Sequence, residues 1–190
     1  MAQPAAGGLS GQHECAGRRR LWSSAAIPLH LVAFDLLGGR EVRLSTGSAV
    51  DAIAASASIP GIFAPVTIGE QRLIDGGVVN NTPISHAIEL GAERIYVLPT
   101  QEPQSRPARV PTGALDAAIQ GLYLLVGCRL AADIARYSTE AELIVLPAPN
   151  AGCVQPTGFE YSHRLIADAR AATRTALQRS PRRAHLRLVS

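Results

Sequence analysis

Asp75 is the residue whose surroundings best suit a chemical role. It follows the strand-like run Arg72–Ile74 and precedes two glycines, so its carboxylate is expected just past the end of a strand. A carboxylate acts as a general base only when it lies about 2.6 to 3.2 Å from the group that gives up the proton. Gly76 and Gly77 allow the close backbone turn that such placement needs. An aspartate before glycines is also a common turn or capping residue, so these residues alone leave both roles open.

No nucleophile motif accompanies this aspartate. Serine hydrolases of the α/β class carry their nucleophile in a Gly-x-Ser-x-Gly turn, and the pattern occurs nowhere in the 190 residues. The nearest string surrounds Ser10, where a glycine follows one residue after the serine instead of two. Ser48 is better explained as a helix cap. We therefore assign no nucleophile in this chain.

The histidines do not complete a catalytic group either. His13 and His185 fall in the terminal tails, His30 is expected in a strand and His86 in a helix. His163, near the start of the last expected helix, is the one histidine retained as a candidate to line a site. Because the acidic residues and histidines lack metal-ligand spacing, we expect no metal site and no cofactor.

Four short strands and one helix of small residues are expected up to Asp75. Gly38 and Gly39 mark a turn between the first two strands, and Ser48 with Asp51 forms a capping-box-like helix start. The expected elements are strands Leu29–Phe34, Glu41–Leu44, Val66–Ile68 and Arg72–Ile74 and a helix Ala49–Ser58.

Helices alternate with apolar strands after Asp75. Asn81 and Pro83 suit the start of a helix that Gly91 ends. A strand, helix and strand in succession imply a right-handed crossover, and the apolar strands are typical of the interior of a parallel sheet. The expected elements are a helix Pro83–Leu90, a strand Arg94–Leu98, an amphipathic helix Ala114–Tyr137 covering the sheet, a strand Leu143–Leu146 and a closing helix Phe159–Leu177.

Composition indicates one globular α/β domain. Hydrophobic residues make up 47% and charged residues 17% of the chain, whose net charge is +3. The arginines gather near both ends, without the aromatic residues or motifs of a nucleic-acid site. Three widely separated cysteines favour a reducing cytoplasm, and no uninterrupted apolar run approaches the roughly 18 to 20 residues of a membrane span. We expect a leader at 1–28 without regular structure, a domain at 29–178 and a basic tail at 179–190.

Three runs carry a family resemblance by their order and spacing. Ala55–Val66 reads ASASIPGIFAPV, Leu73–Pro83 reads LIDGGVVNNTP, and Leu90–Ala92 reads LGA. Together they place a small-residue helix, an Ile-Pro-Gly-x-Phe-x-Pro exit, a short hairpin, Asp-Gly-Gly and Asn-x-Pro in succession. This combination resembles the C-terminal half of the patatin-like phospholipase domain, from about Leu29 to about Leu177.

The resemblance implies a three-layer α/β/α fold and hydrolysis of acyl esters by a serine–aspartate dyad. In such a dyad the aspartate takes the serine proton directly, and Asp75 occupies that position. Gly76, Gly77, Asn80 and Asn81 belong to the same motif, and the two asparagines are expected to shape the loop and cap the next helix. The glycine-rich oxyanion loop and the nucleophile elbow of the family have no counterpart here.

Two functions remain open on the sequence. The chain is either a lipid acyl hydrolase domain, truncated and inactive alone because it carries only the aspartate half of the dyad, or a degenerate relative that binds lipid or protein without catalysis. Its expected partner is a phospholipid, neutral lipid or other acyl ester, with a peripheral membrane contact as a weaker reading of the basic tail. Absent N-terminal strands would leave an open sheet edge that promotes association, although the sequence does not determine the oligomeric state.

Overall fold

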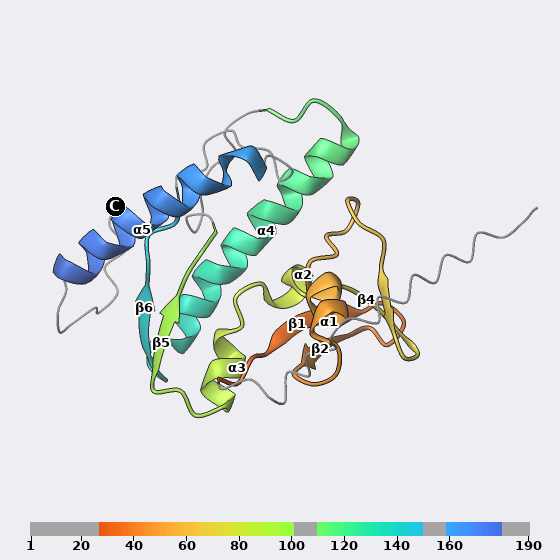
Figure 1. Ribbon diagram of the computed structural model, residues 1–190, viewed down its shortest axis with the longest axis horizontal. Helices are drawn as coiled ribbons and strands as arrows, with labels where there is room; N and C mark the ends of the chain where they lie inside the picture. The colour runs from red at the N-terminus through yellow and green to blue at the C-terminus, as the bar shows by residue number, and fades with distance from the viewer. Residues whose placement is uncertain (1–26, 101–109, 150–158, 180–190) are drawn as a thin grey trace, which may run out of the picture.

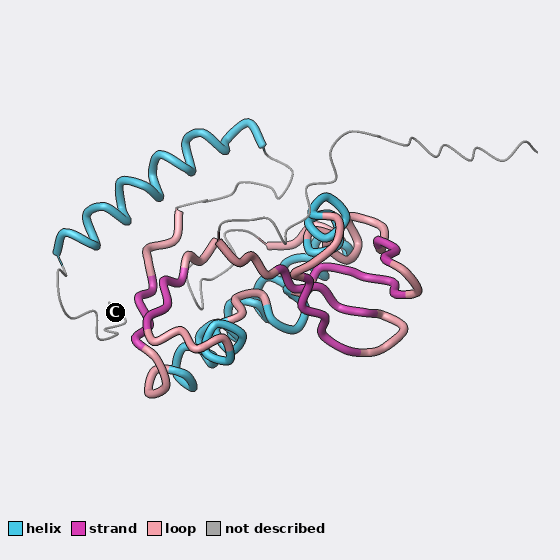
Figure 2. Tube along the Cα trace, turned by 60° about the horizontal axis from the view of Figure 1, so that its bottom comes forward, coloured by secondary structure: helices cyan, strands magenta, loops and turns pink. Residues whose placement is uncertain are grey.

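The computed structural model describes residues 27–100, 110–149 and 159–179 (Figure 1). Strands and helices are mixed along these ranges, which confirms the α/β class. Figure 2 shows the strands in two groups, with a larger sheet toward one end of the molecule and a smaller sheet toward the other. Almost all of the expected leader and of the basic tail lies outside the described residues.

The larger sheet has four antiparallel strands in the order β2-β1-β4-β3. Both expected hairpins are confirmed, because β1 pairs with β2 and β3 pairs with β4. Ala33 of β1 lies opposite Asp75, the last residue of β4, so the central pair of strands carries the candidate base. The strands are β1 Leu31–Asp35, β2 Arg40–Leu44, β3 Val66–Ile68 and β4 Gln71–Asp75.

Helix α1, Ala49–Ser56, packs on this sheet. It begins as expected, since Ser48 Oγ accepts a hydrogen bond from the Asp51 backbone N–H at 3.3 Å. Ala55 is fully buried against Ala33 and Leu73. Small side chains on both elements let the helix approach the sheet closely, and this contact fixes the position of the chain that leads to Asp75.

The smaller sheet consists of two parallel strands, β5 Arg94–Val97 and β6 Glu142–Val145. Helix α4, Ala114–Tyr137, connects them and begins and ends where the sequence predicts. Helix α3, Ile84–Glu89, packs against α4 and covers the same face of the sheet. The core between them is made of Ile84, Val97, Leu130, Ile134 and Leu143.

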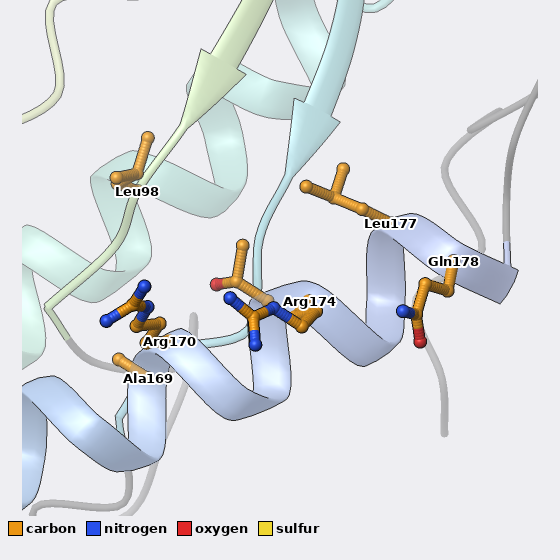
Figure 3. A pocket seen from close by; sticks show the side chains of 7 residues that line it. Leu98, Ala169, Arg170, Arg174, Leu177 and Gln178 are labelled. Atoms are coloured by element: carbon orange, nitrogen blue, oxygen red, sulfur yellow. The ribbon is translucent and has the colours of Figure 1, made fainter.

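Two expectations about these strands are wrong. Strands β4 and β5 belong to separate sheets, so the segment between them is no crossover within one sheet, and the parallel unit is instead β5-α4-β6. Nor is β5 buried on both faces: Val97 is 2% exposed, but Tyr96 is 51% exposed. Helices α3 and α4 cover one face, whereas α5, Ser162–Arg179, lies along the other side after a short 3-10 turn at Phe159–Tyr161 (Figures 1 and 3).

Helix α4 covers the sheet with only its C-terminal half. Leu130 and Ile134 are buried, whereas Leu115, expected on the same covering face, is 58% exposed. Within the described residues α4 is the one helix long and apolar enough, by length and composition, to cross a bilayer, although the sequence analysis found no such span. Only 22% of its most apolar stretch is buried, so the core formed by Leu130 and Ile134 accounts for a small part of that apolar character.

Candidate active site

Asp75 is held by two hydrogen bonds at the end of β4. Its backbone N–H donates to the carbonyl oxygen of Ser58 at 3.0 Å, which ties the strand to the segment after α1. Its Oδ1 accepts the backbone N–H of Gly77 at 2.7 Å. Within the described residues Oδ2 forms no hydrogen bond. One carboxylate oxygen is therefore anchored and the other is left for a partner.

The surroundings of Asp75 make it a stronger base than an ordinary aspartate. Partial burial raises the pKa of its carboxyl group, and the hydrogen bond from the Gly77 N–H opposes this effect in part. A carboxylate with a raised pKa binds a transferred proton more tightly, which favours general-base catalysis. Because Asp75 is only partly buried, a hydroxyl group can still approach it.

The two glycines are needed for space, not for an unusual backbone conformation. Gly76 has an ordinary helical φ of −67°, but a Cβ atom there would lie 2.5 Å from the backbone carbon of Val32. A Cβ atom on Gly77 would lie 2.8 Å from Asn81 Oδ1 and 3.1 Å from Asp75 Oδ1. The close backbone turn expected from the two glycines is therefore a close approach of the motif to β1.

The sequence analysis missed a short helix, α2, at Gly77–Asn80. Because this helix takes up the residues expected to form a loop, Asn81 ends α2 and does not cap α3. Helix α3 begins after Pro83 without a side-chain cap. The expectation that Asn81 caps the next helix is therefore wrong.

Asn80 joins α2 to its neighbours. It is 5% exposed, and its amide group donates to Glu41 Oε1 at 3.1 Å, to Glu41 Oε2 at 3.3 Å and to Ser85 Oγ at 3.3 Å. His86 Nε2 lies 2.6 Å from Glu41 Oε1. These contacts anchor α2, and with it the Gly77 N–H that holds Asp75, between β2 and α3. No local pattern in the sequence links Glu41 to the motif.

Helix α4 adds Tyr123 to the surroundings of Asp75. Burial raises the pKa of the Tyr123 hydroxyl, and the negative charge of Asp75 raises it further. Helix α2, which follows Asp75, packs against α4, so α4 borders the site. The sequence analysis did not identify Tyr123, because only the folded chain brings it near the motif.

Within the described residues, no serine or histidine side chain forms a hydrogen bond with the Asp75 carboxylate. Ser58 follows α1 close to the site, but its hydroxyl is buried and donates to the Ala54 carbonyl oxygen at 2.7 Å. His163 is exposed in the first turn of α5, and His30 precedes β1 instead of lying in a strand. Ser10, His13 and His185 lie outside the described residues. Within the described ranges no three acidic, histidine or cysteine side chains gather as metal ligands.

Known proteins match the segment of the chain that contains Asp75. A family model described as Patatin-like phospholipase matches residues 15–88, a range that contains Asp75 and its two glycines. The uncharacterized NTE family proteins Rv2565 of Mycobacterium tuberculosis and Mb2594 of Mycobacterium bovis are each 30% identical to this chain, over 79% of the chain and 29% of the relative. A third, Rv1063c of M. tuberculosis, is 34% identical over 44% of the chain and 23% of the relative. The chain thus spans less than a third of the length of these relatives.

Proposed function

Because the chain belongs to the patatin-like phospholipase family, we propose that it is part of a lipid acyl hydrolase in which Asp75 is the general base of a serine–aspartate dyad. The observation that carries the proposal is the Asp75 carboxylate, with one oxygen anchored by Gly77, the other open and its pKa raised by burial. The family supports a domain of the lipid hydrolase type. The dyad and the acyl-ester substrate are our proposal.

The proposed reaction uses Asp75 twice. Its open oxygen takes the proton of a serine hydroxyl as the serine oxygen attacks the ester carbonyl, and the carboxylic acid then protonates the departing alcohol. Water hydrolyses the acyl-serine by the same steps in reverse order. The Gly77 N–H keeps the carboxylate in place throughout, and the Glu41–Asn80 contact keeps α2 in place.

The nucleophile does not come from this sequence, which contains no Gly-x-Ser-x-Gly motif. We therefore expect that the purified 190-residue chain neither reacts with a fluorophosphonate probe for active serines nor hydrolyses a short-chain nitrophenyl ester above background. Heat-denatured chain is the control for non-specific labelling. Stoichiometric labelling of any serine would contradict the proposal, and Ser10 would then be the first residue to replace.

The role of Asp75 is tested in a protein that joins this chain to a segment carrying the Gly-x-Ser-x-Gly motif. Asp75→Asn preserves the size of the side chain and removes its basicity, so turnover should fall by about a hundredfold or more. Asp51→Asn, an exposed aspartate in the first turn of α1, is the matched control and should leave turnover unchanged. Near-normal turnover by a folded Asp75→Asn variant would mean that Asp75 is only a turn residue.

The absence of the nucleophile motif also favours a second candidate, a relative that binds lipid or protein without catalysis. The joined protein separates the two functions. Hydrolysis that depends on Asp75 supports the hydrolase, whereas binding of lipid vesicles without any turnover supports the binding protein.

A further inference from the structure

A second candidate site lies away from Asp75, between the end of β5 and α5 (Figure 3). It is a groove of about 570 Å³, a volume within the range of roughly 300 to 1,000 Å³ usual for small-molecule sites. Its lining includes Leu98, Ala169, Arg170, Thr173, Arg174 and Leu177. The carboxyl ends of parallel strands are the usual place for ligands on open α/β sheets, and Leu98 directly follows β5.

The groove combines apolar surface with positive charge. Leu98 is 72% and Leu177 43% exposed, so both leave hydrocarbon surface open to solvent. In Figure 3 the guanidinium group of Arg170 lies between Leu98 and Ala169, with Arg174 one turn further along the helix. Such a surface suits a ligand with an apolar part and an anionic end.

The charge of the two arginines is not neutralised within the described part of the chain. Neither forms an ion pair with a described carboxylate, and no aspartate or glutamate lies three or four residues from either along α5. Like charges four residues apart on a helix repel each other and destabilise it. An anion bound to both groups would offset this repulsion, and a guanidinium group matches the geometry of a carboxylate.

We propose that this groove binds one single-chain anionic amphiphile, a fatty-acid carboxylate, with its carboxylate on Arg170 and Arg174 and its chain against Leu98 and Leu177. The choice of a fatty acid rests on the proposed function, because hydrolysis of a lipid ester releases this anion. The groove shares no residue with the Asp75 site. It therefore binds the product at a second place and not at the reacting centre.

The direct test is calorimetric titration of the 190-residue chain with decanoate below the concentration at which it forms micelles. We expect saturable binding of one decanoate per chain. Decanol has the same hydrocarbon chain without the charge, and it should bind at least about tenfold more weakly, since a charged hydrogen-bonded pair is lost. Equal binding of decanol and decanoate would overturn the proposal, as would the absence of decanoate binding.

Substitutions in α5 test whether decanoate binds in the groove. Arg170→Gln and Arg174→Gln keep a good helix former and should each weaken decanoate binding by about tenfold. Arg164→Gln is the matched control on the same helix, because Arg164 lies over the ring of Tyr161 outside the groove, and it should leave binding unchanged. Equal weakening by all three substitutions would mean non-specific attraction and would overturn the site. In the unsubstituted chain, decanoate should shift the amide NMR signals of Leu98 and Thr173.

Two further measurements separate this proposal from its alternatives. Vesicles of phosphatidylcholine with anionic phosphatidylglycerol test a membrane surface as the ligand, and binding to vesicles without binding to decanoate would overturn the proposal. Asp75→Asn should bind decanoate like the unsubstituted chain. Because the titration requires no turnover, a failure of the hydrolase proposal and a failure of the groove give different results.

Discussion

The raised pKa of the Asp75 carboxyl group lowers the stability of the folded chain at neutral pH. Its pKa is raised in the folded chain, so its ionised form is less favourable there than in the unfolded chain. The stabilising effect of the raised pKa is fully present below the unfolded value of about 3.9 and is lost as the pH rises through the folded value. At neutral pH the ionised carboxylate therefore lowers the free energy of unfolding.

From this sign we expect Asp75→Asn to stabilise the chain at neutral pH. The gain should be no more than about 1 kcal/mol, because solvent screens a partly exposed group, and it should shrink as the pH falls to about 4. The asparagine Oδ1 can still accept the Gly77 N–H. Urea unfolding at the two pH values measures the difference. A destabilised variant at neutral pH would show that the carboxylate is a structural anchor.

The charge of Asp75 also sets the ionisation of its neighbour on α4. Since burial and then this charge raise the pKa of Tyr123, Asp75→Asn should lower that pKa while leaving the part caused by burial. Absorbance of tyrosinate during alkaline titration measures the change, and Tyr123→Phe identifies which step belongs to Tyr123. If Asp75→Asn leaves the Tyr123 step in place, the two side chains are not electrostatic neighbours in solution.

At the scale of elements, the side chains of α4 differ in burial along the helix. Leu130 is 4% exposed in the core of the smaller sheet, whereas Leu125 is 69% exposed on the same helix. We expect Leu130→Ala to lower the free energy of unfolding by about 2 to 5 kcal/mol, and Leu125→Ala, the matched control, to change it by less than about 0.5 kcal/mol. Urea unfolding measures both. Equal effects would mean that Leu130 and Leu125 do not differ in burial as described.

At the scale of the whole molecule, the smaller sheet leaves backbone groups open to other chains. In the described residues β5 and β6 pair only with each other, so each strand has an unpaired edge. Exposed edges of this kind promote association between chains. We therefore expect the isolated chain to form oligomers or aggregates, as judged by light scattering.

A charge on the edge strand should reduce that association. Tyr96 of β5 is 51% exposed and Tyr161 of the 3-10 turn is 42% exposed. Tyr96→Lys should lower the average mass in light scattering, and the control Tyr161→Lys should not. A compact monomer with one sharp thermal transition before any substitution would contradict the expectation.

The sequence by itself determined the elements whose limits depend on neighbouring residues. The hydroxyl of Ser48 marks the start of α1, paired β runs around short turns make the two hairpins, and apolar periodicity marks the full length of α4. The order of motifs around Asp75 also indicated the family. These features are local, because caps, turns and periodicity act over a few residues. The sequence analysis missed the short helix α2 because Gly77 and Asn80, two of its four residues, and the preceding Gly76 disfavour a helix by local propensity.

Only the tertiary structure decided what surrounds Asp75 and which strands share a sheet. The contacts of Glu41 with Asn80 and His86, and the effect of the Asp75 charge on the pKa of Tyr123, join residues far apart in the sequence. That β4 and β5 belong to separate sheets likewise depends on pairing between strands far apart in the sequence. The apolar composition of β5 could not reveal that only one of its faces is covered. Such outcomes depend on packing between remote segments, which local propensity does not encode.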